Sequence, residues 1–572
     1  MVRAAEYIPL SLEGQVIVLK RQKSERRRII LGGFIVLVLI VTIPLILFVG
    51  GRSWPLKAST TVAVSSFRGG ATISAINDKV VLMHKTGHSV IYDRIPIQFV
   101  EPRPDIPNRL IYSDVSLQMA NFSVVDALAN LTDFLSQSPI SSDEYYRLQT
   151  AHQNGDNVAP TKTGWTLDRF KFAPLTTHAW KTYPNASWYI TVDGDSHLMW
   201  STLLRWLERY FDRPESNAWY LGYDEVGSRE SSEFFAHGGA GYAMSRALVE
   251  ALHKGDPDGI KFNRDSHFEE IICGDCALGT VIAHLPGRNG HTDAGGDVFH
   301  HDGLDKLIFR PRLWHTYVLS LHHNTPDQLN YLRQWEKRFL PTIPEWDGVR
   351  QCDVLYGLTP AFLRNPLQAY LRAVAAVNNS THSDEDADAA RQELARLNRT
   401  VIQPAWKADQ VDRWECNAAC MNRNGGQMTA EVCDRACDSH KNCYGWQLSQ
   451  SSCFLALNGF RIGSPEDPKS QISTAWRLDR IADLETAMPC SDLDFRWAAD
   501  ERGHGLKAGK SDQLNTGLDQ RWIVPNRTSV ANKDGHGASW NRTTPWILPQ
   551  GPYQPKGTEA SNKGEAKNQT NT

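Results

Sequence analysis

The strongest chemical signal in the sequence is a pair of acidic residues at the end of an apolar run. Residues 188–200 read WYITVDGDSHLMW, so a strand is predicted to end in Asp193-Gly194-Asp195 and to lead into an amphipathic helix. In open α/β sheets, ligands bind at the carboxyl ends of strands. Two carboxylates two residues apart can face one side, and such hard oxygen ligands suit Mg²⁺ or Mn²⁺ carrying a diphosphate. The alternative is an acidic turn in which Asp195 or Ser196 caps the helix.

Three later segments carry residues that could serve the same site. Residues 234–252 read FFAHGGAGYAMSRALVEAL, where the glycines would let the backbone approach a ligand closely. Residues 273–285 read CGDCALGTVIAHL, with Asp275 before an apolar segment; its alternative role is to cap a helix beside a Cys273–Cys276 disulfide. His322 ends an apolar run in LSLHHNTPDQLNYL, and its alternative role is that of a packed core histidine.

These segments lie within a pattern of alternating strand and helix candidates. Short apolar runs that end in turn or acidic residues begin after Lys79 with VVLMH and continue with RLIYSD, as is typical of buried parallel strands. Helices are predicted over residues 124–135 and 197–211. The pattern predicts an α/β domain with a mostly parallel sheet over residues 79–405.

Composition and charge exclude several classes of protein. The chain has 572 residues, which allows two to four domains at about 150 residues each. Its formal net charge of −3 gives no basic excess, so we expect no nucleic-acid partner. With 41% apolar and 22% charged residues, the chain is expected to be globular rather than mostly disordered.

The apolar run at residues 29–50 predicts a single membrane-spanning helix. It carries no charge, and about 20 apolar residues suffice to cross the hydrocarbon core. Basic residues before it predict a cytosolic tail over residues 1–28 and a lumenal remainder that begins with a stem over residues 51–78. The alternative is a cleaved signal peptide, whose apolar region is usually shorter and nearer the terminus.

Glycosylation sequons accord with a lumenal location. All of them follow the apolar run. They are Asn121, Asn130, Asn185, Asn378, Asn379, Asn398, Asn526, Asn541 and Asn568, of which all but Asn378 and Asn568 are taken as candidate glycosylation sites.

Residues 411–485 form a separate cysteine-rich segment, followed by a polar tail over residues 486–572 whose end is predicted to be disordered. All 10 cysteines of the chain follow the apolar run, and an even count in an oxidising compartment favours disulfides. Zinc is the competing interpretation of the cysteine spacing, but no histidine lies at a matching position. The candidate disulfide cysteines are Cys273, Cys276, Cys416, Cys420, Cys433, Cys437, Cys443 and Cys453.

Seven segments in this order resemble the fringe-like family 31 glycosyltransferases, which include fringe and the core 1 β1,3-galactosyltransferase. They are VVLMHKTG, RLIYSD, GWTLDRFKF, the Asp-Gly-Asp strand, FFAHGGAGYAMSR, CGDCALG and LSLHH. The resemblance covers residues 79–345 and is strongest toward fungal-type members. The segment VCDRACDSHKNCYGWQLSQSSCFLALNGFRIG resembles a PAN/apple module, a type of module that binds protein or carbohydrate.

The resemblance implies a GT-A fold, a Rossmann-like sheet that binds a UDP-sugar, with Mn²⁺ (or Mg²⁺) as cofactor. It implies that Asp195, supported by Asp193, is a metal ligand together with His322 rather than His323, and that Asp275 is the general base. Many relatives carry three consecutive acids, or Glu-Ala-Asp-Thr, where this chain has Asp-Gly-Asp-Ser, but the final acid is kept. The positions that match segments around the nucleotide-sugar are Lys85, Thr86, Gly87, Asp114, Asp193, Gly194 and Asp195, and those that match the sugar and acceptor pocket are Gly238, Gly239, Ala240 and Gly241.

Glycosyl transfer would use each of these parts. A divalent cation stabilises the charge of the leaving UDP, and an inverting reaction needs one base to deprotonate the acceptor hydroxyl. The predicted function is that of a type II Golgi membrane enzyme that transfers a hexose or N-acetylhexosamine, with galactose or N-acetylglucosamine favoured, in β1,3 linkage to a glycan or glycoprotein. The alternatives are a catalytically inactive glycan-binding protein and an adhesion protein whose function lies in the PAN-like module. The sequence leaves the sugar, the acceptor and the oligomeric state open.

Overall fold

The computed structural model describes the chain in several stretches. These are residues 76–99, 106–226, 234–265, 273–288, 291–343, 347–379, 384–410, 412–414, 427–450 and 452–491. The chain divides into two units, Met1–Arg68 and Gly69–Thr572, and all elements named below belong to the second. The helices in these stretches all lack the length or the apolar character that a bilayer crossing needs. The predicted membrane span at 29–50, residues 51–75 of the predicted stem, Cys416, Cys420, Asn526, Asn541 and Asn568 lie outside the described residues.

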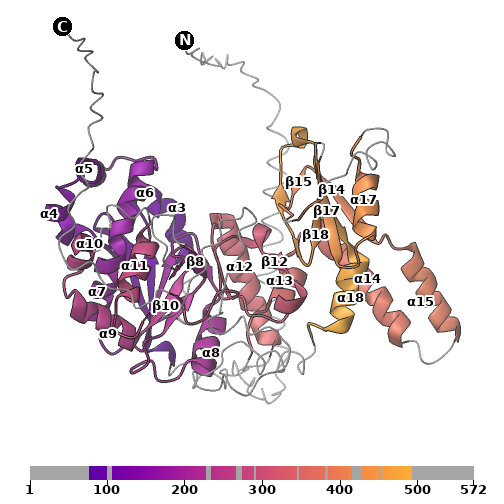
Figure 1. Ribbon diagram of the computed structural model, residues 1–572, viewed down its shortest axis with the longest axis horizontal. Coiled ribbons are helices and arrows are strands. Elements are labelled where there is room, and N and C mark those ends of the chain that lie inside the picture. The colour runs from indigo at the N-terminus through magenta and orange to yellow at the C-terminus, as the bar shows by residue number, and fades with distance from the viewer. Residues whose placement is uncertain are drawn as a thin grey trace, which may run out of the picture. The chain divides into compact units, whose positions relative to one another are not determined.

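A seven-stranded sheet forms the centre of the N-terminal part, drawn in indigo to magenta in Figure 1. The four strands β4, β2, β1 and β5 run parallel, while β3 and β10 pair antiparallel with their neighbours. This arrangement confirms the expected α/β class with a mostly parallel sheet. In sheet order the strands are β3 (Leu117–Met119), β4 (Phe122–Asp126), β2 (Asn108–Ser113), β1 (Val80–Lys85), β5 (Trp188–Asp193), β10 (Tyr242–Ser245) and β7 (Tyr220–Gly222).

Both faces of this sheet are buried, because successive side chains of a strand point to opposite faces. Val81 and Met83 of β1 belong to one apolar cluster, which includes residues of several helices. Val80 and Leu82 belong to another cluster, which includes the buried face of α8. The helices of the first cluster include α5 (Pro139–Asn154), α6 (Lys162–Asp168), α7 (Phe172–Thr182), α9 (Arg246–Gly255) and α11 (Gly274–Ala283). Helix α8 spans Trp200–Tyr210.

Two predicted helices need correction. The helix expected over 124–135 is wrong in its first half, because Val124 pairs with Ile111 of β2 and the segment continues the sheet as β4. β-branched residues such as the two valines of this segment favour a strand; only the short α4 (Thr132–Leu135) is helical, after a 3₁₀ turn. The helix expected over 197–211 is confirmed as α8, but its first residues form the short strand β6 (His197–Leu198).

A second, three-stranded sheet joins distant parts of the chain. Strand β6 pairs antiparallel with β13 (Ser320–Leu321), and β13 pairs parallel with β11 (Phe299–His300). Leu321 lies opposite His197, so the residue that follows β13 lies beside the residues that precede β6. This pairing is what brings His322 to Asp195.

The cysteine-rich module, drawn in orange in Figure 1, contains a five-stranded antiparallel sheet. Its helix α17 (Ala430–Asp438) is attached by the disulfides Cys433–Cys453 and Cys437–Cys443. Disulfides, not zinc, therefore occupy the four described cysteines of the segment, while its PAN/apple character stays a prediction. Strand β14 belongs to this sheet, so the sheet begins upstream of the expected boundary at residue 405. The strand order is β14 (Thr400–Pro404), β21 (Ile472–Arg477), β17 (Cys443–Ser449), β18 (Ser452–Leu457) and β16 (Asp412–Trp414).

An apolar cluster and one disulfide connect this module to the preceding helices. The cluster contains side chains of α12 (Pro326–Phe339), α13 (Gln351–Leu358) and α18 (Leu478–Ala487). The Cys352–Cys490 disulfide joins α13 to the residues just after α18, a pair that was not among the expected candidates. The remaining helices here are α14 (Ala361–Asn379) and α15 (Asp384–Arg396).

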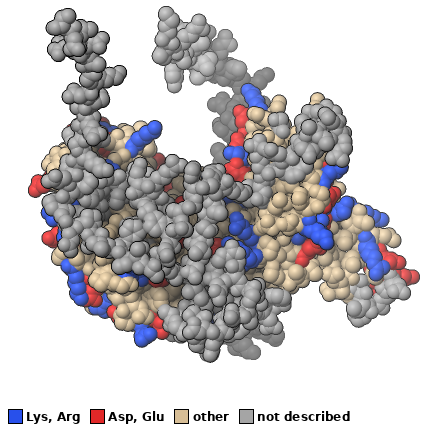
Figure 2. All heavy atoms as spheres, viewed as in Figure 1, with Lys and Arg blue, Asp and Glu red and all other residues tan. Residues whose placement is uncertain are grey.

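The visible surface carries both signs of charge. Figure 2 shows Lys and Arg side chains interspersed with Asp and Glu, in keeping with the formal net charge of −3. The asparagines of the candidate sequons at 121, 130, 185, 379 and 398 are all exposed, as glycosylation requires. Their modification stays a prediction.

Candidate metal and nucleotide-sugar site

The acidic turn Asp193–Ser196 links β5 to β6 and is held from two sides. Gln98 Nε2 donates hydrogen bonds to the carbonyl oxygens of Gly194 (3.0 Å) and Ser196 (3.1 Å). On the other side, the backbone N–H and the side-chain amide of Asn324 both donate to the Asp195 carbonyl, at 3.0 and 3.2 Å. Met199, which has no side-chain capping bond, is the N-cap of α8. The alternative in which Asp195 or Ser196 caps this helix is therefore wrong.

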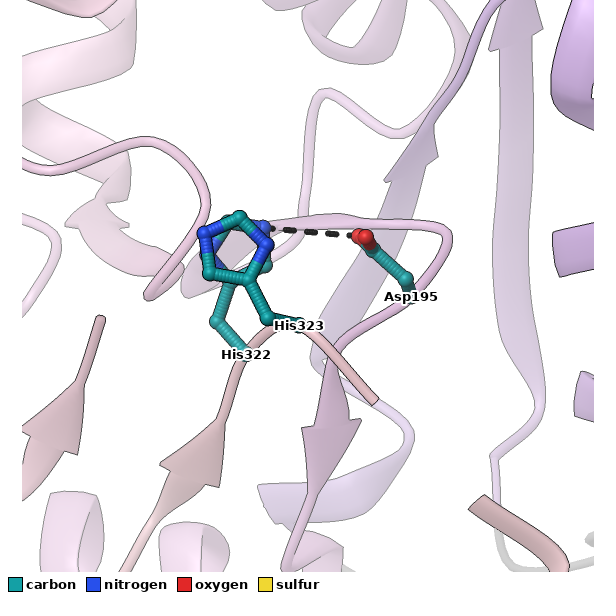
Figure 3. Close-up of side chains that lie close together, drawn as sticks. All are labelled: Asp195, His322 and His323. Atoms are coloured by element: carbon teal, nitrogen blue, oxygen red, sulfur yellow. Dashed lines mark ion pairs between the residues drawn. The ribbon is translucent and has the colours of Figure 1, made fainter. Parts of the chain in front are cut away.

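His322 faces the two carboxylates of this turn. Its Nε2 lies 3.4 Å from Asp195 Oδ1 and 3.9 Å from Asp193 Oδ2, and Figure 3 shows the ring and the Asp195 carboxylate pointing toward each other. Its Nδ1 lies 3.0 Å from the carbonyl oxygen of His301. A carbonyl can only accept, so Nδ1 carries the proton and the neutral ring presents the Nε2 lone pair to the carboxylates.

This convergence of acceptors fits a bound cation. Asp195 Oδ1 is buried and, among the residues the structure describes, has no hydrogen-bond partner. Burial lowers the pKa of His322, but the facing carboxylates of Asp195 and Asp193 outweigh burial and raise it above its ordinary value. A positive charge at this point, whether a proton or a metal ion, therefore stabilises the site. Carboxylate and imidazole donors together suit a divalent metal ion.

His323 also lies at this point. One donor atom each from Asp195, His322 and His323 lies within 4.8 Å of the others. The two rings stack with centroids 3.8 Å apart, and Figure 3 shows one lying over the other. His323 has a φ of 57°, a left-handed conformation that costs energy in a non-glycine residue and that occurs often at functional sites. The sequence singled out His322 alone, whereas the structure brings both histidines to Asp195.

The glycine loop 238–241 closes over the His322 ring. A Cβ at Gly239 would lie 2.1 Å from His322 Cε1, closer than any real contact allows. The loop is anchored by Ser196 Oγ, which donates to the Gly239 carbonyl at 2.7 Å, and by Ser320 Oγ, which donates to the Ala240 carbonyl. Gly241 has a φ of 83°, and a side chain there would meet Val192. The loop therefore fixes the imidazole rather than lying open to solvent.

We expect Gly239→Ala to displace the His322 ring, because the new methyl group has no room. Overpacking of this kind typically costs about 1–3 kcal/mol of stability, and thermal unfolding would measure this loss. The affinity for Mn²⁺, measured by calorimetry in the presence of UDP, should fall at least about tenfold. Gly296→Ala is the matched control, because a Cβ there meets nothing within 4 Å. Equal metal affinity in the two variants would contradict this role for Gly239.

A chain of alternating charges runs from the acidic turn toward the end of β2. Lys85 Nζ lies 2.9 Å from Asp193 Oδ1 and also contacts Asp168. Lys171 Nζ then lies 3.1 Å from Asp168 Oδ1 and 3.0 Å from Asp114 Oδ2. Burial alone would lower the pKa of Lys85, but the carboxylates of Asp168 and Asp193 raise it, so the ammonium stays charged. His322 Nε2 lies nearer to Asp195 than to Asp193, and His323 also reaches Asp195, so Asp195 is the better placed of the two acids to bind a cation.

This chain gathers the residues expected around the nucleotide-sugar. Lys171 Nζ donates to the Thr86 carbonyl at 2.8 Å, and a Cβ on Gly87 would lie 3.3 Å from Asp114 Oδ2. Asp114 Oδ1 also accepts a hydrogen bond from the His88 N–H at 2.7 Å. The ends of β1, β2 and β5 thus meet at one edge of the sheet. Their role in binding a nucleotide-sugar stays a prediction.

Asp168→Asn should remove an acid-sensitive contribution to stability. Burial raises the pKa of Asp168, but Lys85 and Lys171 together lower it from 3.8 to about 2. A carboxyl whose pKa is lowered in the folded state stabilises the fold at pH values above its ordinary pKa. This contribution is lost as the pH falls from about 4 to 2. The free energy of unfolding near neutral pH should fall by about 2 kcal/mol, measured with denaturant.

The matched control for that change is Asp388→Asn. Asp388 pairs with Arg391 at 2.8 Å on an exposed helix, where ion pairs contribute little. Its removal should change the free energy of unfolding by less than about 0.5 kcal/mol. An Asp168→Asn protein as stable as the control, with the same loss of stability in acid, would show that the buried lysines do not depend on Asp168.

Asp275 lies in the first turn of α11 and contacts the glycine loop. Its Oδ2 accepts a hydrogen bond from the Gly238 N–H at 2.6 Å, and its Oδ1 accepts one from the Cys276 N–H at 3.0 Å. The Cys273–Cys276 disulfide brackets it, and Cys273 is the N-cap. Burial raises the pKa of Asp275, and the Gly238 N–H and His237 only partly offset this. The helix-start role and the disulfide are thus both present, and the raised pKa makes this carboxylate a stronger base than an exposed one.

Several residues of the site were not predicted. Arg94 lies 3.1 Å from Asp195 Oδ2, and together they line a cavity of about 230 Å³. His237 packs its ring 5.8 Å from that of His322 and accepts a hydrogen bond from the Ala240 N–H. Asp168 lies in the GWTLDRFKF segment, which is part of the family resemblance but was assigned no functional role. His237 is the histidine in FFAHGG, a segment that was singled out for its glycines alone.

Part of the chain that contains this site matches a known protein family. Residues 141–336 match the family model described as Fringe-like. No curated protein matches the chain. The matched span contains Asp168, the acidic turn, Asp275 and His322. Fringe-like glycosyltransferases generally use a UDP-sugar donor and a divalent metal. Residues 141–336 are thus similar to the fringe-like glycosyltransferases.

Proposed function

We propose that the protein is an inverting glycosyltransferase that uses a UDP-sugar and Mn²⁺ (or Mg²⁺). It transfers a hexose or N-acetylhexosamine, galactose or N-acetylglucosamine being favoured, in β1,3 linkage to a glycan or glycoprotein. The observation that carries the proposal is the convergence of Asp195 and His322 beside a glycine loop that also contacts Asp275. A candidate metal-binding group and a candidate base beside one loop fit such a transfer.

Each group has a distinct part in the reaction. Asp195 and His322 would hold the cation, with His323 adjacent, and a bound cation would supply positive charge to the diphosphate as it leaves. Arg94, beside Asp195, would add a second positive charge on the same side. Asp275 would accept the proton of the acceptor hydroxyl as that oxygen attacks the anomeric carbon. The Lys85–Asp168–Lys171 chain would keep the nucleotide-binding edge of the sheet in place.

The location of the enzyme is part of the proposal. Residues 29–50 would anchor it as a single-pass type II protein of the Golgi membrane, with the catalytic domain in the lumen. The two disulfides of the described cysteine-rich module and the exposed sequons accord with an oxidising, glycosylating compartment.

Release of UDP is the direct test. The lumenal segment, residues 52–572, would be incubated with a panel of UDP-sugars, with Mn²⁺ and then with a chelator. We expect release from one donor that the chelator abolishes. Silence from every donor, together with no metal-dependent binding of UDP, would reject the proposal and favour a catalytically inactive glycan-binding protein.

A further inference from the structure

A second cavity lies where the cysteine-rich module meets the preceding domain. One wall is Arg310–Arg312, just after strand β12 (Ile308–Phe309). The other wall is Asn442 and Tyr444 at the start of β17, with Leu457–Gly459 at the end of β18. Its volume is about 420 Å³, within the range of about 300–1,000 Å³ that small-molecule sites occupy. We call it the junction cleft.

The walls of the junction cleft are fixed relative to each other. Strand β12 pairs antiparallel with β19 (Phe460–Arg461), so one strand from each wall joins a shared ladder. At Gly459 the two backbones come so close that a Cβ would lie 2.7 Å from Arg310 Cγ and 2.9 Å from the Phe309 carbonyl oxygen. A cleft with walls fixed in this way is formed before a ligand arrives, which lowers the entropic cost of binding.

The side chains that line the cleft offer neutral hydrogen-bonding groups beside an aromatic ring. Asn442 Nδ2 donates to Asn458 Oδ1, which leaves Asn442 Oδ1 as an acceptor and Asn458 Nδ2 as a donor, side by side. Such a pair matches two adjacent hydroxyl groups of a sugar. Tyr444, half-buried in the same wall, adds an amphipathic aromatic surface.

Two arginines, Arg310 and Arg312, line the cleft, and the charge of Arg312 is paired. Both terminal nitrogens of Arg312 are engaged by Asp297, at 3.2 and 3.4 Å, so its positive charge is already paired. Among the described residues that line the cleft, none is acidic, so it offers no carboxylate ligand to a cation. The amides and the aromatic ring of the lining suit a hydroxyl-rich molecule.

We propose that the junction cleft binds a short neutral oligosaccharide, as a subsite for a part of the acceptor glycan away from the reacting hydroxyl. The acceptor role rests on the proposed function, whereas binding of the oligosaccharide does not. A site shared by both parts of the chain also gives the cysteine-rich module a function beyond stabilising its neighbour.

Direct binding tests the proposal without relying on catalysis. Full-length protein, in a detergent without a sugar headgroup and without Mn²⁺ or UDP, would be titrated with β-linked di- and trisaccharides of glucose, mannose, galactose and N-acetylglucosamine. Saturation-transfer NMR and calorimetry would measure affinity. The double variant Asn442→Ala/Asn458→Gly removes both amides, and glycine suits the φ of 63° at position 458. We expect it to weaken binding about tenfold, as loss of two neutral hydrogen bonds predicts.

Lys441→Ala is the matched control, because Lys441 is exposed and adjacent to Asn442 but does not line the cleft. It should bind like the unchanged protein. Three results would each overturn the proposal: no saturable binding of any of these oligosaccharides, equal affinity in the double variant and the control, or displacement of the oligosaccharide by inorganic phosphate. Active transfer without such binding would overturn the cleft alone, and binding without transfer would count against the proposed function alone.

Discussion

Asp275→Asn is expected to lower kcat by about 10²–10⁴-fold while leaving the affinity for UDP and Mn²⁺ unchanged. A positioned general base contributes an acceleration of this size, and an amide cannot accept the proton. Asparagine has the same shape as aspartate and keeps an oxygen that can accept the Gly238 N–H. Steady-state rates with a donor and its acceptor, together with calorimetry of UDP binding, would separate the chemical step from binding.

The matched control for this change is Asp256→Asn. Asp256 is also buried and also accepts two backbone N–H groups, from Ile260 at 3.0 Å and Phe262 at 2.7 Å, but it lies outside the candidate site. Its variant should retain kcat within a few-fold. If Asp275→Asn retained kcat as well as the control does, another group would have to be the base.

The same assignment predicts a pH dependence. Only the deprotonated carboxylate can accept a proton, so kcat/KM rises with pH through the pKa of Asp275. Because burial raises that pKa above its ordinary 3.8, the acid limb of the profile should lie above the range of an exposed carboxyl. The limb should vanish in the residual activity of Asp275→Asn. An acid limb that persists unchanged in the variant would belong to another group.

The central strands and the acidic turn could be predicted because their signals are local. The apolar runs that became β1, β2 and β5 each end in a polar or acidic residue, and that pattern identifies buried parallel strands without knowledge of their neighbours. The same reasoning failed for the segment that forms β4. Its apolar residues fit either period, and only the pairing of Val124 with Ile111 decides for a strand.

The contacts that complete the site could not be predicted, because they join residues that are far apart in the sequence. Lys85 and Asp168 are 83 positions apart, and no pattern within either segment indicates that one neutralises the other. The same holds for the Cys352–Cys490 disulfide, which spans 138 positions. Asp275 and His322 were singled out through a family resemblance, whereas the His301 carbonyl that fixes the His322 tautomer is a backbone group, to which side-chain types give no clue.

Asp195→Ala is the change with the largest expected effect on the metal site. Mutating groups that merely orient metal ligands typically costs 10–100-fold in metal affinity, so loss of a ligand should cost at least about 100-fold. Activity should fall by a similar factor or more, because the charge on the departing diphosphate would lack its counterion. Titration of Mn²⁺ in the presence of UDP, followed by electron paramagnetic resonance, would measure the loss directly.

Asp224→Ala is the matched control for Asp195→Ala. Asp224 Oδ2 lies 3.3 Å from His291 Nδ1, a carboxylate–imidazole pair with nearly the spacing of Asp195 and His322. In the Asp224 pair, however, the carboxylate also accepts hydrogen bonds from the backbone and hydroxyl of Thr292. Its oxygens are therefore satisfied, whereas Asp195 Oδ1 is buried and, among the described residues, lacks a hydrogen bond. Loss of Mn²⁺ binding in the Asp195 variant alone would show that the unsatisfied oxygen marks the metal site; equal binding in both variants would place the metal elsewhere.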